Sequence, residues 1–327
     1  MKFKAVKVDN RYEDIEIEKK ILNAAGADLF EFNCTDEEKI IEITKDADGI
    51  ITDLSAITEK VIKNMKKCRV ISKVGIGVDN INVKAATENG ILVCNVPNYC
   101  INEVSDHTMA LILSLIRKTV YMNNLAKKGE WGVDFAKPIS PLNEMTLGLV
   151  GFGSIARLVY SKAKAFNFHI ILFDPYIDKK MADSYEIQLV TFEYLLKNSD
   201  IISIHCPANS ETKHLFGKKE FMQMKKRAFL VNTSRGIIID NIALYQALKE
   251  GIISAAAVDV YDPEPINPED PILSLDNFII TPHYGFYSER SIREVREKSA
   301  LNVARVLTDE EPVNIVNKEV LSIRKSI

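Results

Sequence analysis

The stretch LGLVGFGSIA at residues 147–156 places an apolar run directly before two glycines, and the glycines directly before a segment with a helical pattern. Gly151, Gly153 and Ala156 have the spacing G-x-G-x-x-A. In this motif the first glycine permits a tight turn, the second lets the backbone approach a pyrophosphate, and the small third residue lets helix and strand pack closely. The free N–H groups and positive dipole end of the helix then favour an anion. The stretch predicts either a dinucleotide site or a plain turn at a strand end.

Asp174 strengthens the dinucleotide interpretation. It ends the apolar run IILFD, 21 residues after Gly153, where an acidic side chain can accept hydrogen bonds from ribose hydroxyls. A carboxylate there also repels a 2′-phosphate, so the sequence favours NAD over NADP; a purely structural acid is the alternative.

A second glycine pair, Gly75 and Gly77, has no small residue at the third position and predicts either a loop whose backbone approaches a small ligand or a tight turn.

Length and composition limit the possible classes of protein. A chain of 327 residues exceeds what one hydrophobic core usually supports, so we expect two domains. The net charge of −3 and the lack of a basic stripe argue against nucleic acid as a partner. Five scattered cysteines without C-x-x-C spacing argue against a disulfide framework or a structural metal site, and favour the cytoplasm. The N-terminal pattern and the interrupted apolar segments predict neither a signal peptide nor a membrane span.

Strands and helices alternate along most of the chain. Residues 1–96 read as βα units, and a second series runs from residue 147 to residue 283. This alternation predicts an α/β protein with parallel sheets, the second of them doubly wound. The helix predicted over 101–118 is apolar nearly all round and must be buried against a domain or another subunit, so we expect a homodimer. Residues 131–145 read as a long surface connection. Helices are predicted at roughly 240–250 and 288–308, the second amphipathic and followed by a short polar tail.

Three polar residues follow predicted strands of the second series. Arg235 follows LVNTS, Glu264 lies in YDPEP and His283 lies in ITPHYG. Each alone has a plain reading, as a surface arginine, a turn acid and a capping histidine. Together they suit hydride transfer, which needs a cation for an anionic substrate, a proton carrier active near neutral pH, and a carboxylate that orients this carrier.

With these residues, the chain resembles the D-2-hydroxyacid dehydrogenase family over essentially its whole length, with the closest likeness to the branch that contains the C-terminal binding proteins. The resemblance rests on ordered blocks: SKVGIGVDNIN, NVPNYCINEVSDH, LGLVGFGSIAR, FDPY, HCPANSETKHLF, FLVNTSRG, AAAVDVYDPEP and TPHYGFYSE. It implies an NAD-dependent oxidoreductase that interconverts a 2-oxo acid and its D-2-hydroxy acid. Glu264 argues against the formate dehydrogenase branch, while Ala208 and the order Tyr284-Gly285-Phe286 depart from the nearest branch and leave side-chain specificity open.

The resemblance also implies residue roles. His283 would exchange a proton with the substrate, Glu264 would hold His283 and favour its protonated form, and Arg235 would bind the carboxylate and polarise the carbonyl. The backbone N–H groups of Val74 and Gly75 would bind the other side of the carboxylate. The residues implied for NAD, from pyrophosphate through ribose and adenosine to nicotinamide, are Gly151, Gly153, Ser154, Ile155, Asp174, His205, Pro207, Thr233 and Asp259. A buried turn is an equal alternative for His205 and Pro207, and His107 is interpreted as a core histidine.

The family's domain division implies a Rossmann-type NAD-binding domain at 101–286. Residues 1–100 and 287–327 would form a smaller, flavodoxin-like substrate domain, and the cleft between the domains would close on the substrate. Two other functions remain open: an NAD(H)-responsive binding protein resembling a corepressor, and a phosphoglycerate dehydrogenase of serine biosynthesis.

Overall fold

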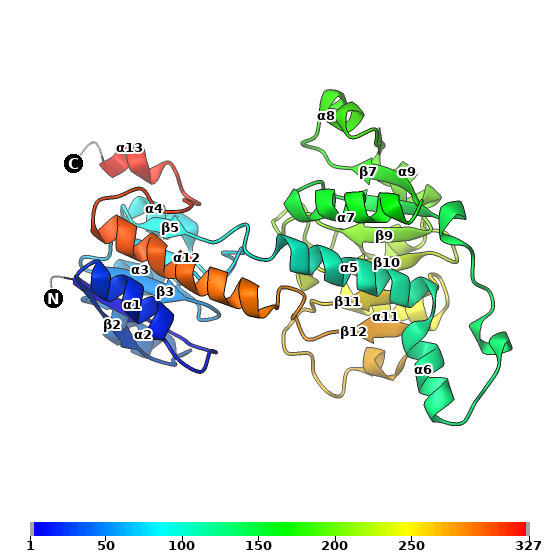
Figure 1. The fold of residues 1–327 in the computed structure, drawn as a ribbon, viewed down its shortest axis with the longest axis horizontal. Coiled ribbons are helices and arrows are strands. Elements are labelled where there is room, and N and C mark those ends of the chain that lie inside the picture. Colours follow the sequence, from blue (N-terminus) through cyan, green and yellow to red (C-terminus); the bar gives the residue numbers. More distant parts are fainter. Residues whose placement is uncertain (1–2, 325–327) are drawn as a thin grey trace. The chain divides into compact units, whose positions relative to one another are not determined.

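The computed structural model describes residues 3–324. The chain divides into two compact units (Figure 1). Unit 1 consists of residues 1–100 and 288–327, and unit 2 consists of residues 101–287. Each unit is built on a parallel β-sheet covered by helices, so the predicted α/β fold class is confirmed.

Unit 1 contains a five-stranded parallel sheet with the order β2-β1-β3-β4-β5. Its strands are β1 (Phe3–Lys7), β2 (Ala27–Glu31), β3 (Gly49–Thr52), β4 (Val70–Lys73) and β5 (Leu92–Cys94). Its helices are α1 (Glu16–Ala24), α2 (Glu37–Thr44), α3 (Glu59–Lys63), α4 (Val83–Glu88), α12 (Glu289–Leu307) and α13 (Val320–Arg324). β3 and β4 are buried along their whole length, as expected for strands covered on both faces.

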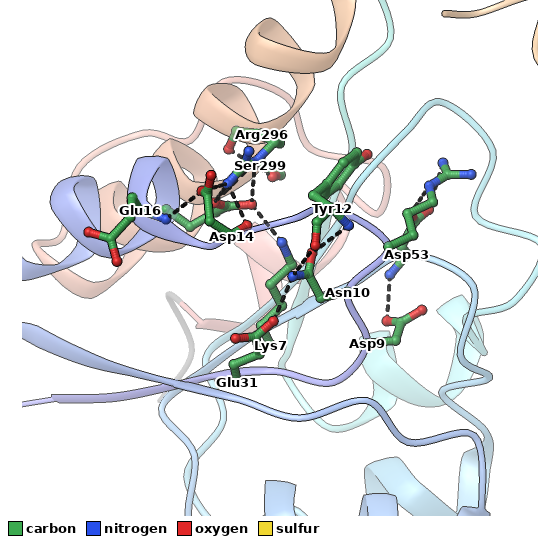
Figure 2. A network of polar contacts seen from close by, with 12 residues as sticks. Lys7, Asp9, Asn10, Tyr12, Asp14, Glu16, Glu31, Asp53, Arg296 and Ser299 are labelled. Carbon is green, nitrogen blue, oxygen red and sulfur yellow. Dashed lines mark hydrogen bonds and ion pairs between the residues drawn. The ribbon is translucent and has the colours of Figure 1, made fainter.

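A buried ionic group attaches the C-terminal helix α12 to the start of the chain. Glu18 on α1 is fully buried, and its carboxylate accepts hydrogen bonds from Lys7 at 2.6 Å and from the Nη2 of Arg296 at 2.8 Å. Arg296 also donates to the side chain of Asp14 at 2.8 Å (Figure 2). Because a buried charge is costly without a partner, this group ties α12 to α1 and β1 although they are far apart in sequence.

Unit 2 contains a seven-stranded parallel sheet with the order β12-β11-β10-β9-β6-β7-β8. Its strands are β6 (Thr146–Val150), β7 (His169–Phe173), β8 (Gln188–Leu189), β9 (Ile201–Ile204), β10 (Phe229–Asn232), β11 (Ala255–Val258) and β12 (Phe278–Ile280). Its α-helices are α5 (Ile101–Ile116), α6 (Thr119–Lys127), α7 (Ser154–Ala165), α8 (Lys179–Ser184), α9 (Phe192–Asn198), α10 (Lys218–Phe221) and α11 (Asn241–Lys249). Short 3₁₀ helices are η1 (Val133–Ala136), η2 (Leu142–Glu144), η3 (Gly236–Ile238) and η4 (Pro271–Ser274).

The strand order of unit 2 fixes where a ligand can bind. β6 is the first strand of this sheet along the chain, and β7 and β9 pair with its two sides. Along the chain, strands are therefore added first on the β7 side of β6 and then on the β9 side. In open α/β sheets such a switch point leaves a crevice outside the carboxyl ends of the strands. Within residues 3–324, no helix has the length and hydropathy to cross a membrane.

Candidate active site

The residues predicted for chemistry in unit 2 follow the carboxyl ends of its strands. Because the strands are parallel, these ends lie at one edge of the sheet. Gly151 follows β6, Asp174 follows β7, and His205 follows β9. The segments after β10, β11 and β12 contribute Thr233 and Arg235, Asp259 and Glu264, and His283, in that order.

Gly151 is required by the turn that ends β6. Its φ of +93° lies in a region that L-residues rarely adopt, and its N–H donates to the carbonyl of Phe173 at 2.8 Å. A Cβ added to Gly151 would lie 2.8 Å from the backbone nitrogen of Cys206. Both backbone conformation and packing against the end of β9 therefore exclude a side chain here.

Gly153 has a different environment. It is the N-cap of α7, and a Cβ added to it would meet no described heavy atom within 4 Å. Packing within the described protein therefore does not demand glycine. The bare backbone leaves room for a group above the N-terminus of α7, where Ser154 and Ile155 are the first residues of a twelve-residue helix. This arrangement fits a pyrophosphate held by backbone N–H groups and the helix dipole.

Asp174 is held beside the glycine turn. Its Oδ2 accepts from the N–H of Phe152 at 2.8 Å, and its Oδ1 accepts from the N–H of Tyr176 at 2.8 Å. The carboxylate is partly exposed and each oxygen retains a further lone pair. This placement fits the predicted role of accepting hydrogen bonds from a ribose.

Burial of the His205 ring disfavours its charged form. Its Nε2 lies 2.9 Å from the hydroxyl of Ser203. Although the residue is only half-buried overall, desolvation of the imidazole lowers the pKa of His205 to about 4. Pro207 is exposed, and its carbonyl accepts from the hydroxyl of Thr212 at 2.7 Å. These contacts leave the predicted adenosine roles of His205 and Pro207 as predictions.

His283 and Glu264 form a hydrogen-bonded pair. The Nδ1 of His283 lies 2.7 Å from the Oε2 of Glu264, and the two side chains are 43% and 38% exposed. The other carboxylate oxygen accepts from the N–H of Tyr261 at 3.0 Å, which fixes its orientation. Burial alone would raise the pKa of Glu264, but the bonds from His283 and Tyr261 and the charge of Arg235 outweigh burial and lower it. Glu264 is therefore ionised at neutral pH, and the opposite ring nitrogen of His283 is left for a substrate.

Arg235 is brought near this pair by a close backbone contact. Its carbonyl accepts from the side chain of Asn232 at 2.8 Å, and Gly236 follows it in η3. A Cβ added to Gly236 would overlap the backbone of Tyr261, so a larger residue would push η3 away from the segment that carries Glu264. The positive charge of Arg235 also helps to lower the pKa of Glu264.

Asp259 holds the backbone that presents His283. It is 4% exposed, and its carboxylate accepts from the N–H groups of Tyr284 at 3.1 Å and Gly285 at 2.9 Å, while its carbonyl accepts from the N–H of His283 at 2.8 Å. Burial would raise the pKa of Asp259, but hydrogen bonds from His107, Thr281 and Gly285 lower it. These bonds hold His283 at a φ of +50°, an uncommon backbone conformation for histidine.

His107 belongs to the frame of the site. Its Nε2 lies 3.0 Å from the hydroxyl of Thr281, and its ring packs edge-on against Tyr284 with centroids 4.8 Å apart. The next residue on α5, Thr108, is hydrogen bonded to Thr233 at 2.8 Å between the hydroxyls. These contacts agree with the interpretation of His107 as a core histidine, but the sequence did not indicate which residues it contacts. Adjacent polar residues on an otherwise apolar helix were the available signal.

In unit 1, Gly75 follows β4 with a φ of +146°. The N–H of the preceding residue, Val74, donates to the carbonyl of Thr52 at 2.9 Å. Because this bond uses the N–H of Val74, Gly75 is the better placed donor of the predicted pair. The carboxylate-binding role itself stays a prediction.

Comparison with known families accounts for this arrangement. The family model described as "D-isomer specific 2-hydroxyacid dehydrogenase, NAD binding domain" matches residues 109–285, which lie within unit 2. Those residues include the glycine turn, Asp174, Arg235, Glu264 and His283.

Three relatives show how far the similarity extends. A D-3-phosphoglycerate dehydrogenase of Methanocaldococcus jannaschii is 41% identical over 301 residues, which are 91% of this chain but only 57% of that protein. A glyoxylate reductase of Korarchaeum cryptofilum is 37% identical over 290 residues, 87% of each chain. The structure of D-lactate dehydrogenase from Aquifex aeolicus, complexed with NAD and lactic acid, is 25% identical with a TM-score of 0.84, over 94% of this chain and 96% of that one.

Proposed function

Because the chain belongs to the D-isomer-specific 2-hydroxyacid dehydrogenase family, we propose that it is an NAD-dependent oxidoreductase that interconverts a 2-oxo acid and its D-2-hydroxy acid. The observation that carries this proposal is the His283–Glu264 pair at 2.7 Å, which lies at the same sheet edge as the glycine turn. The charge of Arg235 helps to lower the pKa of Glu264 in this pair. Unit 2 binds NAD in this proposal, and unit 1 contributes to substrate binding.

NAD, when bound, donates or accepts the hydride. Gly151, Gly153 and the first residues of α7 hold its pyrophosphate, and Asp174 accepts hydrogen bonds from its ribose. Thr233 and Asp259 remain the residues proposed near the nicotinamide. Asp259 would act largely through the backbone it fixes, since its carboxylate already accepts bonds from Thr281, Tyr284 and Gly285.

His283 moves the proton. In reduction its Nε2–H donates to the substrate carbonyl oxygen as that oxygen gains negative charge, and in oxidation the neutral ring takes the proton back. Glu264 accepts the Nδ1–H, which sets the tautomer, orients the ring and favours the imidazolium. Arg235 binds the substrate carboxylate with its planar guanidinium and polarises the neighbouring carbonyl. Val74 and Gly75 of unit 1 remain proposed as substrate-binding residues.

The decisive experiment measures NADH oxidation by the purified chain with glyoxylate, pyruvate, hydroxypyruvate and phenylpyruvate. We expect turnover of at least one of these acids, and a rate roughly 10²–10⁴-fold lower in His283→Ala, because positioned proton transfer contributes that much. NADH binding without turnover of any 2-oxo acid would instead support an NAD(H)-responsive binding protein. The similarity to a phosphoglycerate dehydrogenase keeps phosphohydroxypyruvate as a second candidate substrate.

We also propose that the chain forms a homodimer through α6 and the segment that follows it. Helix α5, expected to mediate assembly, packs largely within its own unit and has eight buried residues. Helix α6 has no buried residue, and Trp131 and Val133 after it are 89% and 70% exposed. Such an apolar surface suits a subunit contact. Sedimentation should give the mass of a dimer, and Trp131→Ser with Val133→Asp should shift it toward a monomer; a wild-type monomer would reject the proposal. The five cysteines are scattered and odd in count, which supports a cytoplasmic location.

A further inference from the structure

The carboxyl ends of β1 and β3 form the switch point of unit 1. Successive segments of the chain place β2 on one side of β1 and β3 on the other. In sheets with this strand order, ligands bind outside the carboxyl ends at this point. Gly75, the unit 1 residue proposed to bind substrate, follows β4 at the same edge. The residues after β1 and β3 therefore lie at the same sheet edge as this proposed substrate-binding residue.

An anion site exists at this switch point, and the chain fills it with its own carboxylate. The successive N–H groups of Asp53, Leu54 and Ser55, directly after β3, all donate to Asp9, at 2.8, 2.5 and 3.0 Å. Successive backbone N–H groups of this kind make a concavity that binds anions. Asp9 is only 6% exposed, and the hydroxyl of Thr52 adds a longer bond of 3.3 Å. A phosphate could not use these donors without displacing Asp9.

The two cations beside this site are paired with Asp53. The Nε of Arg11 lies 2.6 Å from the Oδ2 of Asp53, and the Nζ of Lys73 lies 3.2 Å from its Oδ1 and also bonds its carbonyl (Figure 2 shows Asp53 and Asp9). The side chain of Asp53 is 3% exposed and that of Lys73 is 11% exposed. The charges of Arg11 and Lys73 are thus balanced by those of Asp9 and Asp53. Leu54, at the tip of the same turn, is 68% exposed.

From this balance we propose that the substrate carries an uncharged R group, and that Asp9 and Asp53 exclude 2-oxo acids with a phosphate or a second carboxylate on that group. An added anion would meet two carboxylates, an occupied backbone site and cations that are already paired. It would lose water without gaining a matching charge. This inference rests on the proposed function, which it narrows from 2-oxo acids in general to those without a second anionic group.

The test compares two substrates that differ only by the phosphate. Hydroxypyruvate and 3-phosphohydroxypyruvate are reduced by the full chain with NADH, and kcat/KM is measured for each. We expect kcat/KM to be at least roughly tenfold higher for hydroxypyruvate, since a phosphate without a charged partner lacks even one charge-assisted hydrogen bond. Equal or better use of the phosphorylated acid overturns this inference and leaves the proposed function standing. Failure to turn over any 2-oxo acid rejects the proposed function, and this inference with it.

Asp53→Asn tests which residue sets the preference. Without this carboxylate Arg11 and Lys73 can bind an anion, so the ratio of the two kcat/KM values should move roughly tenfold toward the phosphorylated acid. Asp48→Asn is the matched control, because it removes an equal charge at the opposite end of β3, where Asp48 bonds Lys4 and Lys67. An unchanged ratio in a folded Asp53→Asn variant would remove Asp53 from the proposal. If that variant does not fold, the wild-type comparison still decides the substrate class.

Discussion

Replacing Glu264 by glutamine tests the proposed proton transfer, because it removes a charge while keeping an acceptor for the Nδ1–H of His283. A hydrogen bond to a charged group contributes about 1.5–3 kcal/mol and a neutral one about 0.5–1.5 kcal/mol, so the imidazolium loses about 1–1.5 kcal/mol. Both side chains are roughly 40% exposed and solvent screening places the loss at the lower end. One pH unit corresponds to about 1.4 kcal/mol, so the midpoints of the pH profiles should shift by a little less than one unit.

The direction of the shift follows from the proton balance. Reduction needs the imidazolium, so kcat/KM for the 2-oxo acid falls as the pH rises, while oxidation needs the neutral ring and rises over the same range. Losing the carboxylate moves both midpoints to lower pH. The assay is kcat/KM from NADH absorbance between pH 5 and pH 10, in both directions. Glu269→Gln, on the same exposed segment, is the control and should leave both midpoints in place. Unchanged midpoints in Glu264→Gln with normal NADH binding would refute the assignment.

Three further predictions concern other parts of the molecule. Asp174→Ala should narrow the preference for NADH over NADPH, measured as a ratio of kcat/KM values, because it relieves repulsion of the 2′-phosphate; equal use of both by the wild type would reject the premise. Arg235→Lys should lower kcat/KM for the 2-oxo acid roughly 10- to 100-fold through the loss of bidentate binding, with NADH affinity nearly unchanged in a fluorescence titration. Glu18→Gln should reduce the free energy of unfolding in urea by about 3–5 kcal/mol, because it leaves Lys7 buried without a carboxylate and leaves Arg296 with only that of the more exposed Asp14. Burial would raise the pKa of Glu18, but the bonds from Arg296 and Lys7 lower it, so this stabilisation is present above the ordinary glutamate range and is lost as the pH falls.

The regular elements of the fold could be predicted where local signals agree. The helix predicted near 240–250 is Asn241–Lys249, and the side chain of Asp240 caps it by accepting from two backbone N–H groups. The helix predicted at about 288–308 is Glu289–Leu307, which starts with the hydroxyl of Ser288 accepting from the N–H of Ser291. In both, an N-cap residue precedes an amphipathic pattern.

The sequence did not predict elements that depend on distant contacts. The helix Thr119–Lys127 has no buried residue, so it shows no apolar stripe facing a core. The sequence after residue 308 predicts only a short polar tail. Instead Ile315 forms a bridge with Cys94, and the side chain of Asn317 accepts from the N–H of Val93 at 2.8 Å. Such pairing with an edge strand leaves no local pattern in the sequence.

The sequence predicts which residues belong to the candidate site, but it does not predict the contacts that orient them. Strand ends and family resemblance identified Arg235, Glu264 and His283, because parallel strands bring their carboxyl ends together. The bonds from Asp259 to the backbone around His283, and the place of His107 beside them, join segments that are far apart in sequence. No spacing rule relates these positions, so only the folded chain reveals which residues orient the proton carrier.

The switch points of the two sheets differ in whether their backbone N–H groups are available to an anionic ligand. In unit 2 the glycine turn after β6 leaves space at Gly153 above a helix N-terminus, so a negatively charged ligand is favoured. In unit 1 the backbone donors after β3 are occupied by Asp9, and the neighbouring cations are held by Asp53. Strand order alone would predict a ligand site at the switch point of both units. Side chains from neighbouring strands decide the outcome, and a charged phosphate is therefore expected on the cofactor and not on the substrate.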